Sequence, residues 1–600
     1  MGDYQIKNLY QGGYSSFTPT SYGANIGSYK PARGGSLGIT SDPRTANVLQ
    51  DISGKLNMGA KQIEIAAVSP AMFDAIPEQQ LTEVKRLGKL TGASVSLHGP
   101  VMDVAGFNKE GFNEINREDA ERRIVQVLER SKQLSPDGSI PVTFHSADGM
   151  MGSQWKTLGD EKNPREEKLM IAVERDTGKM TPLKEEKKYY PGEVEGEIKE
   201  TPLSPQKNLK LVNDTQWDDK ISQLFFNKER ADEILRTNHT KIAYLMDDVN
   251  AGKFDITNMT PPQKEAFLKY KDAENYLQDI NRNAKAIFSK AYEFGTPEQR
   301  KALTIISDDY IKNLEMNKDG KKAPDPIKQS QAMHELLLNL RNDELAPEMF
   351  VPIEKFATDQ SAKTFGNAVF QVYKNAKDKN NIPMLCIENP PAGMGLSTGE
   401  DLRNLVKASR EQFVKKATEG GVSEGKAEEL AEKFIGATWD VGHINMLRKE
   451  GFESKDIIKE TEKIAPFVKH VHLSDNFGFE HTELPMGMGN VPMKEIMEKL
   501  GQNGFDAKKI VEASSWWEHF KTPPFRESLE AVGSPIYATK MGPYWSQGPG
   551  FYQDYFPESG ATLPQVNYET FGSNFSKLPM ELGGQRGGAE GSRMSGRGME

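Results

Sequence analysis

Eight short apolar runs, separated by longer amphipathic stretches, constrain the fold of this 600-residue chain more than any other feature. They are Ser36–Thr40, Gln62–Ala67, Ser94–His98, Pro141–His145, Met384–Glu388, Ala437–Val441, His470–Ser474 and Lys509–Glu512. Short runs that alternate with helical patterns are typical of repeated βα units with parallel strands. Eight units predict an α/β fold, a closed (β/α)8 TIM barrel, with reactive groups at the C-terminal strand ends. An open doubly wound sheet is the alternative, but no GxGxxG turn follows the first run.

The fourth predicted unit is interrupted by a long insertion. About 200 residues separate His145 from the next barrel helix near Gln360, whereas βα loops usually need about 2–6 residues. Two apolar runs, at 170–173 and 180–183, flank Asp and Gly turn residues, which indicates a hairpin. Apolar residues then recur at helical spacing from about 217 to 345. We expect a hairpin plus a mostly helical subdomain over 151–350, which gates the site or selects the substrate.

The rest of the chain divides into two barrel halves and two ends. The halves are expected at 35–150 and 351–532. The ends, 1–34 and 533–600, are rich in Gly, Ser, Tyr and Pro without periodicity, which favours flexible segments. Alternatively, the aromatic residues of the tail pack it as an extended arm on the main domain.

Composition and charge narrow the class of protein. The net charge of −10 argues against a chain held on nucleic acid by bulk charge. The single cysteine, Cys386, excludes an intramolecular disulfide, and no long apolar run or N-terminal signal is present. We expect a soluble, cytoplasmic protein without a membrane partner. Its oligomeric state stays open.

Metal-ligand residue types gather at the predicted strand ends. Five of the nine histidines lie at, or shortly past, such an end: His98, His145, His443, His472 and His481. The acids beside them are Glu388, Asp440, Asp475, Glu480 and Glu512. Imidazole and carboxylate groups supply the ligands that Zn²⁺, Mn²⁺ or Mg²⁺ prefer. Because a barrel brings all strand ends to one rim, the pattern predicts a metal-dependent active site.

The individual residues differ in how strongly they indicate a metal site. Glu388 ends an apolar run, where an unpaired charge is costly, so a cation is expected beside it. His98 or His145 alone could simply satisfy a hydrogen bond where a strand meets a loop. His470 shares a strand face with His472 but lies deeper, so we expect it to support the site rather than bind metal.

These residues resemble the superfamily of xylose isomerase-like barrels that also contains endonuclease IV. The resemblance covers about 35–150 and 351–530. Its most specific stretches are His98-Gly99-Pro100, Ile387-Glu388-Asn389 with Ala392-Gly393-Met394-Gly395, Asp440-Val441-Gly442-His443, and His472-Leu473-Ser474-Asp475 followed by Met486-Gly487-Met488-Gly489-Asn490-Val491.

Endonuclease IV carries three zinc ions, and the resemblance implies where they would bind. One metal would be bound by His98, His145 and Glu388. A second would be bound by Glu388, Asp440, His472 and Glu512. A third would take His443 and His481, but the family's Asp two residues before the second of these is Phe479 here. The adjacent Glu480 is the available acid, and a binuclear centre is the alternative. Such a cluster would activate a bridging water for attack on a phosphodiester.

The sugar isomerases and epimerases of the superfamily imply a smaller set. They would use Glu388, Asp440, His472 and Glu512 around one Mn²⁺ or Mg²⁺, with His443 near the substrate. Glu388 and Glu512 would then be the catalytic pair that moves a proton at the carbon next to a carbonyl.

Three functions follow from these comparisons of residues. The first is phosphoester hydrolysis with two or three Zn²⁺, favoured by the additional histidines. The second is isomerisation or epimerisation of a sugar or sugar phosphate. The acidic charge, the insertion and Val101, where endonuclease IV has an aromatic residue, favour a substrate other than DNA. The third is a non-catalytic scaffold. The expected partner is a small sugar or phosphoester, and the charge does not support DNA.

Overall fold

A computed structural model describes most of the chain. It covers residues 37–57, 60–135, 139–157, 165–191, 198–238, 240, 260–314 and 326–513, together with Trp516, Phe520, Pro524 and Ser528. The predicted flexible segments at 1–34 and 533–600 lie outside the described residues. The described residues form two compact units: those up to 166 together with those from Ile353 onward form one, and those of Glu167–Pro352 form the other.

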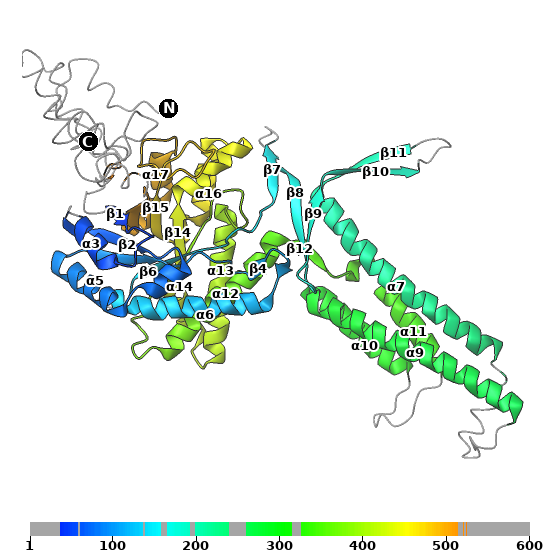
Figure 1. Cartoon of the computed structure of the whole chain (residues 1–600). Helices are drawn as coiled ribbons and strands as arrows, with labels where there is room; N and C mark the ends of the chain where they lie inside the picture. The colour runs from blue at the N-terminus through cyan, green and yellow to red at the C-terminus, as the bar shows by residue number, and fades with distance from the viewer. Residues whose placement is uncertain are drawn as a thin grey trace, which may run out of the picture. The chain divides into compact units, whose positions relative to one another are not determined.

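The first unit is a closed barrel of eight parallel strands (Figure 1). Its strands are β1 (Leu37–Thr40), β2 (Gln62–Ala66), β3 (Ser94–His98), β6 (Pro141–His145), β13 (Met384–Glu388), β14 (Ile435–Asp440), β15 (Val468–Leu473) and β16 (Lys508–Val511). They follow one another around the ring in chain order, and β16 closes it by pairing with β1. The predicted (β/α)8 barrel is therefore confirmed, and its strands are the eight apolar runs of the sequence.

Helices surround the strands (Figure 1). They are α3 (Val48–Asn57), α4 (Pro70–Ala75), α5 (Glu78–Thr91), α6 (Glu114–Ser131), α12 (Ile353–Asn375), α13 (Gly399–Glu419), α14 (Glu424–Phe434), α15 (Val441–Asn445), α16 (Ser454–Ile464) and α17 (Met493–Asp506). Short 3-10 turns stand at Lys132–Leu134, Met446–Glu450 and Ala465–Phe467, and the loops after β3 and β6 hold β4 (Phe107–Asn108), β5 (Gly111–Phe112) and β7 (Gln154–Thr157).

Alternation along the strands separates two environments. Residues such as Ile63, Leu97, Phe144 and Ile387 are buried on the outer face, against the helices. The alternate residues face the barrel interior, which branched apolar side chains usually fill. Here the middle interior layer is largely polar and holds Glu64, Ser96, Thr143, Cys386, Thr438 and His470, all buried. The next layer, at the C-terminal strand ends, holds the predicted metal ligands.

The second unit combines antiparallel strands with long helices. Its strands are β8 (Arg165–Glu174), β9 (Met180–Lys184), β10 (Glu186–Pro191), β11 (Ile198–Leu203) and β12 (Phe350–Pro352). Its helices are α7 (Pro205–Thr237), α9 (Pro261–Phe294), α10 (Pro297–Asn313) and α11 (Pro326–Leu340), with a 3-10 turn at Asp343–Leu345. β8 and β9 form the predicted hairpin, and β12 closes the unit by pairing with β8. The hairpin-plus-helical insertion after the fourth barrel strand is thus present.

The helices of this unit pack around their own core. Trp217, Ile221, Leu277 and Leu337 are buried in it, and the Trp217 Nε1 donates a hydrogen bond to the Leu340 carbonyl at 2.9 Å. The compact unit begins at Glu167, later than the expected 151, because the first residues after β6 group with the barrel. Among the described residues, none of the helices combines the length and apolar character that a membrane span requires.

Candidate metal centre and active site

Glu388, at the end of β13, is the centre of the polar layer at the barrel rim. Its side chain is fully buried, and its Oε2 lies 3.1 Å from His98 Nε2 and 3.3 Å from His145 Nε2. Its Oε1 lies 2.7 Å from His472 Nδ1. One carboxylate therefore gathers imidazoles from β3, β6 and β15, as the sequence analysis expected for a bridging ligand.

Four of the predicted ligands form one compact group. The ligand atoms of Glu388, Asp440, His472 and Glu512 all lie within 4.8 Å of one another. His472 Nδ1 is also 3.3 Å from Glu512 Oε1, and Asp440 Oδ2 is buried without a hydrogen-bond partner. Three carboxylates around one imidazole need a positive charge, and oxygen ligands with one nitrogen suit a divalent cation. These residues therefore fit a metal ion.

The chain turns sharply after β14 to place its two site residues. Asp440 caps the short helix α15, because its Oδ1 accepts a hydrogen bond from the His443 N–H at 2.7 Å. Asn389 fixes the same strand end, with its Oδ1 accepting from the Asp440 N–H at 2.9 Å. A Cβ on Gly442 would collide with the Ser474 Oγ, so only glycine fits this turn. Asp440 and His443 are thus separated by about one helical turn, which places both residues at the rim.

Backbone carbonyls set the direction of two histidines. His98 Nδ1 lies 2.9 Å from the Gly99 carbonyl, and His443 Nδ1 lies 2.8 Å from the Asn389 carbonyl. Because a carbonyl can only accept, each Nδ1 carries the proton and donates it. The Nε2 atoms are then the nitrogens that remain for a cation or another partner.

His481 reaches the rim from the long loop after β15. Its Nε2 lies 2.8 Å from His443 Nε2. Asp475 holds this loop, since its carboxylate accepts hydrogen bonds from the backbone N–H groups of Asn476, Gly487, Gly489 and Val491 at 2.8–3.1 Å.

Glu480 is the predicted ligand that the structure does not bring to the cluster. Its side chain is exposed, and among the described residues no hydrogen bond or ion pair joins it to the other ligands. The neighbouring His481 is also exposed, but it reaches the site through its contact with His443. The acid expected for a third metal is therefore not in place.

The two glutamates of the four-residue group have opposite electrostatic surroundings. Burial opposes ionisation of Glu388, but the adjacent His472 and His145 outweigh it and hold its pKa well below the usual value. Burial raises the pKa of Glu512 well above its usual value, and the negative charges of Glu388 and Asp440 raise it further. Paired carboxyl groups with such opposite environments suit one base and one acid.

Sequence reasoning missed Glu64, which lies in the middle of β2. It is fully buried, and its Oε2 accepts hydrogen bonds from Ser96 Oγ and His470 Nε2, both at 2.8 Å. A signal was available in Gln62-Ile63-Glu64-Ile65-Ala66, where alternation puts the carboxylate on the interior face. Glu64 lies inside its strand, whereas the predicted ligands lie at strand ends.

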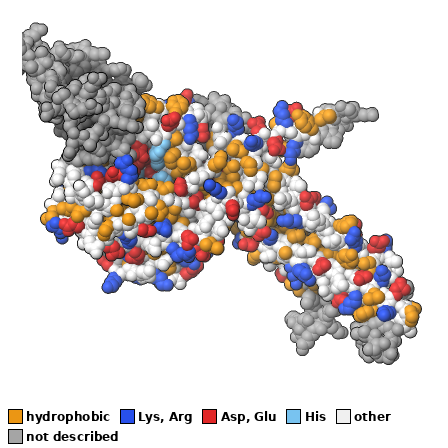
Figure 2. All heavy atoms as spheres, viewed as in Figure 1, with side chains coloured by type: hydrophobic (Ala, Val, Ile, Leu, Met, Phe, Trp, Pro, Cys, Tyr) orange, Lys and Arg blue, Asp and Glu red, His pale blue; other side chains and the backbone are white. Residues whose placement is uncertain are grey.

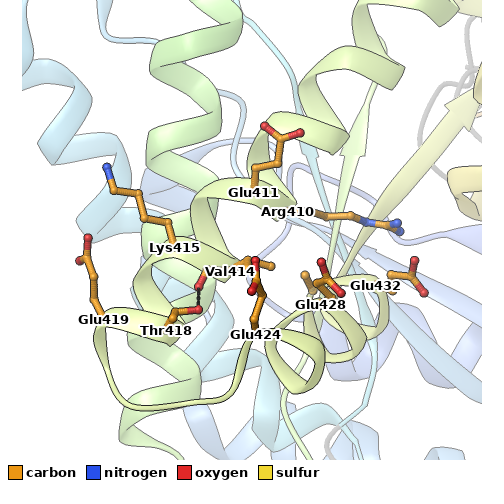
Figure 3. Close-up of a pocket in the computed structure, with 10 residues that line it drawn as sticks. Arg410, Glu411, Val414, Lys415, Thr418, Glu419, Glu424, Glu428 and Glu432 are labelled. Atoms are coloured by element: carbon orange, nitrogen blue, oxygen red, sulfur yellow. Dashed lines mark hydrogen bonds between the residues drawn. The ribbon is translucent and has the colours of Figure 1, made fainter. Parts of the chain in front are cut away.

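Part of the site reaches the surface of the barrel unit. Figure 2 shows histidine side chains beside acidic ones on this surface, and His145 keeps 17% of its side chain exposed. A pocket of about 940 Å³ elsewhere in the barrel unit is lined by none of the site residues. That pocket lies between α13 and α14 and is lined by Arg410, Glu411, Val414, Lys415, Thr418, Glu419, Glu424, Glu428, Ala431 and Glu432 (Figure 3). Its glutamates are exposed, and no metal-ligand group is among them.

The fold and the rim residues define a (β/α)8 barrel with a buried group of histidines and carboxylates that could hold a metal ion. Residues 385–532 match the family model described as xylose isomerase-like TIM barrel. Over these residues, about a quarter of the chain, the protein is similar to xylose isomerase-like barrels, and the resemblance inferred from the motifs is confirmed there.

Individual proteins are more distant. An uncharacterized protein of Methanocaldococcus jannaschii, MJ1311, is 28% identical over 109 residues, which is 18% of this chain and 36% of that protein. The match thus spans about a third of the curated relative. A D-tagatose 3-epimerase-like protein is 12% identical with a TM-score of 0.34, covering 83% of this chain and 99% of the other. The D-psicose 3-epimerase of Clostridium cellulolyticum H10 is 9% identical with a TM-score of 0.35, covering 84% and 98%. Both structural likenesses are weak, and the fold assignment rests on the closed barrel itself.

Proposed function

We propose that the protein is a metal-dependent isomerase or epimerase of a small sugar. The observation that carries the proposal is the group of Glu388, Asp440, His472 and Glu512, whose ligand atoms lie within 4.8 Å of one another. Two glutamates from different strands, β13 and the end of β16, thus stand beside one cation-binding position. This is the arrangement that proton transfer at a carbon next to a carbonyl requires.

The residues divide the chemistry between them. Asp440, His472 and the two glutamates would hold one Mn²⁺ or Mg²⁺, which would polarise the carbonyl of the substrate. Glu388, held ionised by its histidine neighbours, would take the proton from the adjacent carbon. Glu512, the second carboxyl group, would return a proton to the carbon or oxygen that needs one. His443 lies at the rim, where it would contact the substrate.

The rim supports an uncharged substrate rather than a polyanion. Exposed apolar side chains stand in the loops that follow β6, β13 and β15; they are Met151, Met394, Phe477, Phe479 and Met488. The cations of the loop after β14 are engaged, since Lys449 Nζ donates to the Ala392 carbonyl at 2.7 Å and Arg448 Nε donates to Asn445 Oδ1 at 2.9 Å. Recognition of phosphates would need such groups free.

Phosphoester hydrolysis, the first choice of the sequence analysis, is the second candidate. The contacts of His98 and His145 with the Glu388 Oε2 favour it, because a second metal between these groups would make Glu388 a bridge. It ranks second because Glu480 stays outside the cluster and the rim described above does not favour an anionic substrate.

Metal analysis with one variant separates the two candidates. The isomerase should bind one Mn²⁺ or Mg²⁺ per chain, and His145→Ala should keep that ion and most of the turnover of a ketose. A hydrolase should bind two or three Zn²⁺ and lose both metal and phosphodiester cleavage in His145→Ala. Two or more Zn²⁺ per wild-type chain, with cleavage and without isomerisation, would overturn the proposal.

A further inference from the structure

Glu64 lies directly beneath the proposed metal position and touches one of its ligands. Its Oε1 is 2.9 Å from His472 Nε2, at ion-pair distance. Neither atom has a hydrogen-bond partner among the described groups, so the two face each other at ion-pair distance without hydrogen-bond geometry. Its Oε2 is taken by Ser96 and His470, each at 2.8 Å. The orientation of this carboxylate is therefore fixed from two sides, and its free oxygen faces His472.

His472 uses its two ring nitrogens on opposite sides. Nδ1 faces the cation-binding group, 2.7 Å from Glu388 Oε1 and 3.3 Å from Glu512 Oε1, whereas Nε2 faces Glu64. A neutral imidazole carries one N–H, and the nitrogen that binds a cation has none. With a cation on Nδ1, the proton of His472 must be on Nε2, where Glu64 can accept it.

Burying the Glu64 carboxylate costs free energy, which indicates that its negative charge has a role in the protein. Its side chain has no exposed surface, and a buried carboxylate without a partner is costly. A branched apolar residue would fill this interior position at less cost.

A separate metal site is the other use of the same residues. Ligand atoms of Glu64, His470 and His472 do lie within 4.8 Å of one another. However, a cation there would need the Nε2 of His472 while Nδ1 serves the upper position, which would strip both protons from the ring. The Glu64 Oε2 is also already occupied by two donors. The geometry favours a hydrogen-bonding role instead.

We propose that Glu64 is a positioning residue for the metal ligand His472. It fixes the ring orientation and the Nε2–H tautomer, so that Nδ1 is presented to the cation, and its charge makes Nδ1 a stronger donor. Ser96 and His470 hold Glu64 in place for this. The inference rests on the metal site of the proposed function.

The test is the affinity of the full-length chain for Mn²⁺, measured by competition with a chelator. Glu64→Gln keeps the shape and removes the charge, and it should weaken binding by about 10–100-fold. Glu460→Gln is the matched control, because Glu460 is also a buried carboxylate of the barrel unit, 5% exposed, but contacts Glu400 and Lys463 instead. The control should bind Mn²⁺ as the wild type does.

Two outcomes would overturn the inference alone. One is wild-type affinity in Glu64→Gln, and the other is loss of one whole equivalent of Mn²⁺ with the rest bound normally, which would make Glu64 a ligand. A wild-type chain that binds no Mn²⁺ would overturn the proposed metal site together with it.

Two further measurements do not depend on how well Glu64→Gln folds. Ser96→Ala, which removes one donor to Glu64, should weaken Mn²⁺ binding in the same direction by about 2–10-fold. In the Mg²⁺-bound wild type, nitrogen-15 NMR of labelled histidines should show His472 protonated on Nε2. An unchanged affinity in Ser96→Ala, or a proton on Nδ1 of His472, would contradict the positioning role.

Discussion

The Nε2 atoms of His443 and His481 lie 2.8 Å apart, although the two residues come from different loops of the rim. His443 donates its Nδ1 proton to the Asn389 carbonyl, and burial lowers its pKa, which keeps the ring neutral. Its Nε2 is therefore an acceptor, and His481 donates to it. The contact is a hydrogen bond that links the long loop after β15 to the site. Because one nitrogen donates and the other accepts, no cation between the two rings is required.

This contact predicts how His481→Ala behaves. The variant should bind the same amount of metal as the wild type, because His481 lies outside the four-residue ligand group. Its kcat/KM should fall by about tenfold, because the variant loses one hydrogen bond that orients His443 and such a bond contributes about 1 kcal/mol. Metal content and steady-state kinetics measured on one preparation check both points. Loss of a metal equivalent would instead make His443 and His481 ligands.

Cys386 should be inert in the native protein. Its side chain has no exposed surface, and burial raises its pKa to about 12, so the reactive thiolate is absent at neutral pH. Because the chain has one cysteine, a thiol reagent reports on this residue alone. We expect no reaction with native protein and one equivalent after unfolding in guanidinium. Rapid reaction of the native chain would show that the barrel interior opens.

Asp103, in the loop after β3, should make stability depend on pH. Burial raises its pKa to about 6, and the charge of Asp148 adds to the effect. The folded-state pKa exceeds the ordinary value of 3.8, so the protonated form is favoured by folding, and this stabilisation is lost as pH rises through 6.

Asp103→Asn removes that ionisation while keeping an oxygen for the Phe107 N–H, which Asp103 Oδ1 now binds at 2.8 Å. At pH 8 the variant should be more stable than the wild type by on the order of 1–2 kcal/mol, and the difference should vanish near pH 4. Thermal unfolding at several pH values measures this, with the exposed Asp119→Asn as control. Equal pH profiles for Asp103→Asn and wild type would contradict the prediction.

Gly442→Ala should damage the site through packing. The added Cβ collides with Ser474 Oγ, which itself donates to Asp440 Oδ1 at 3.2 Å. We expect a loss of about 1–3 kcal/mol in stability and weaker Mn²⁺ binding. Gly54→Ala is the control, because its Cβ meets nothing within 4 Å in helix α3. It should stabilise the chain slightly. Wild-type stability and affinity in Gly442→Ala would contradict the described turn.

The eight barrel strands were predictable because their outer faces must be apolar to pack against helices. The short helix α15 was not, since it depends on Asp440 as a cap, and the start of the inserted unit was not, since β12 pairs with β8 across the whole insertion. The pairing of β12 with β8 joins residues far apart in sequence and leaves no local pattern, whereas helix α15 is only five residues long and too short to show a helical periodicity.

The site was predictable where a ligand ends a strand and missed elsewhere. Glu388 and His472 stand out at strand ends, whereas Glu64 lies inside a strand, where a polar residue is easily taken as a surface position. Glu480 and His481 are neighbours in the sequence, and only the three-dimensional path of the loop decides which of them contacts the site; in the structure it is His481, through His443.

Hydrogen exchange with solvent tests the central claim most directly. The Mn²⁺- or Mg²⁺-loaded chain, incubated with a panel of ketoses in D₂O, should place deuterium on the carbon next to the carbonyl, as followed by proton NMR. Glu512→Gln should slow this exchange by about 10²–10⁴-fold. Absence of exchange with every ketose in the metal-loaded wild type, together with cleavage of phosphodiesters, would contradict the account.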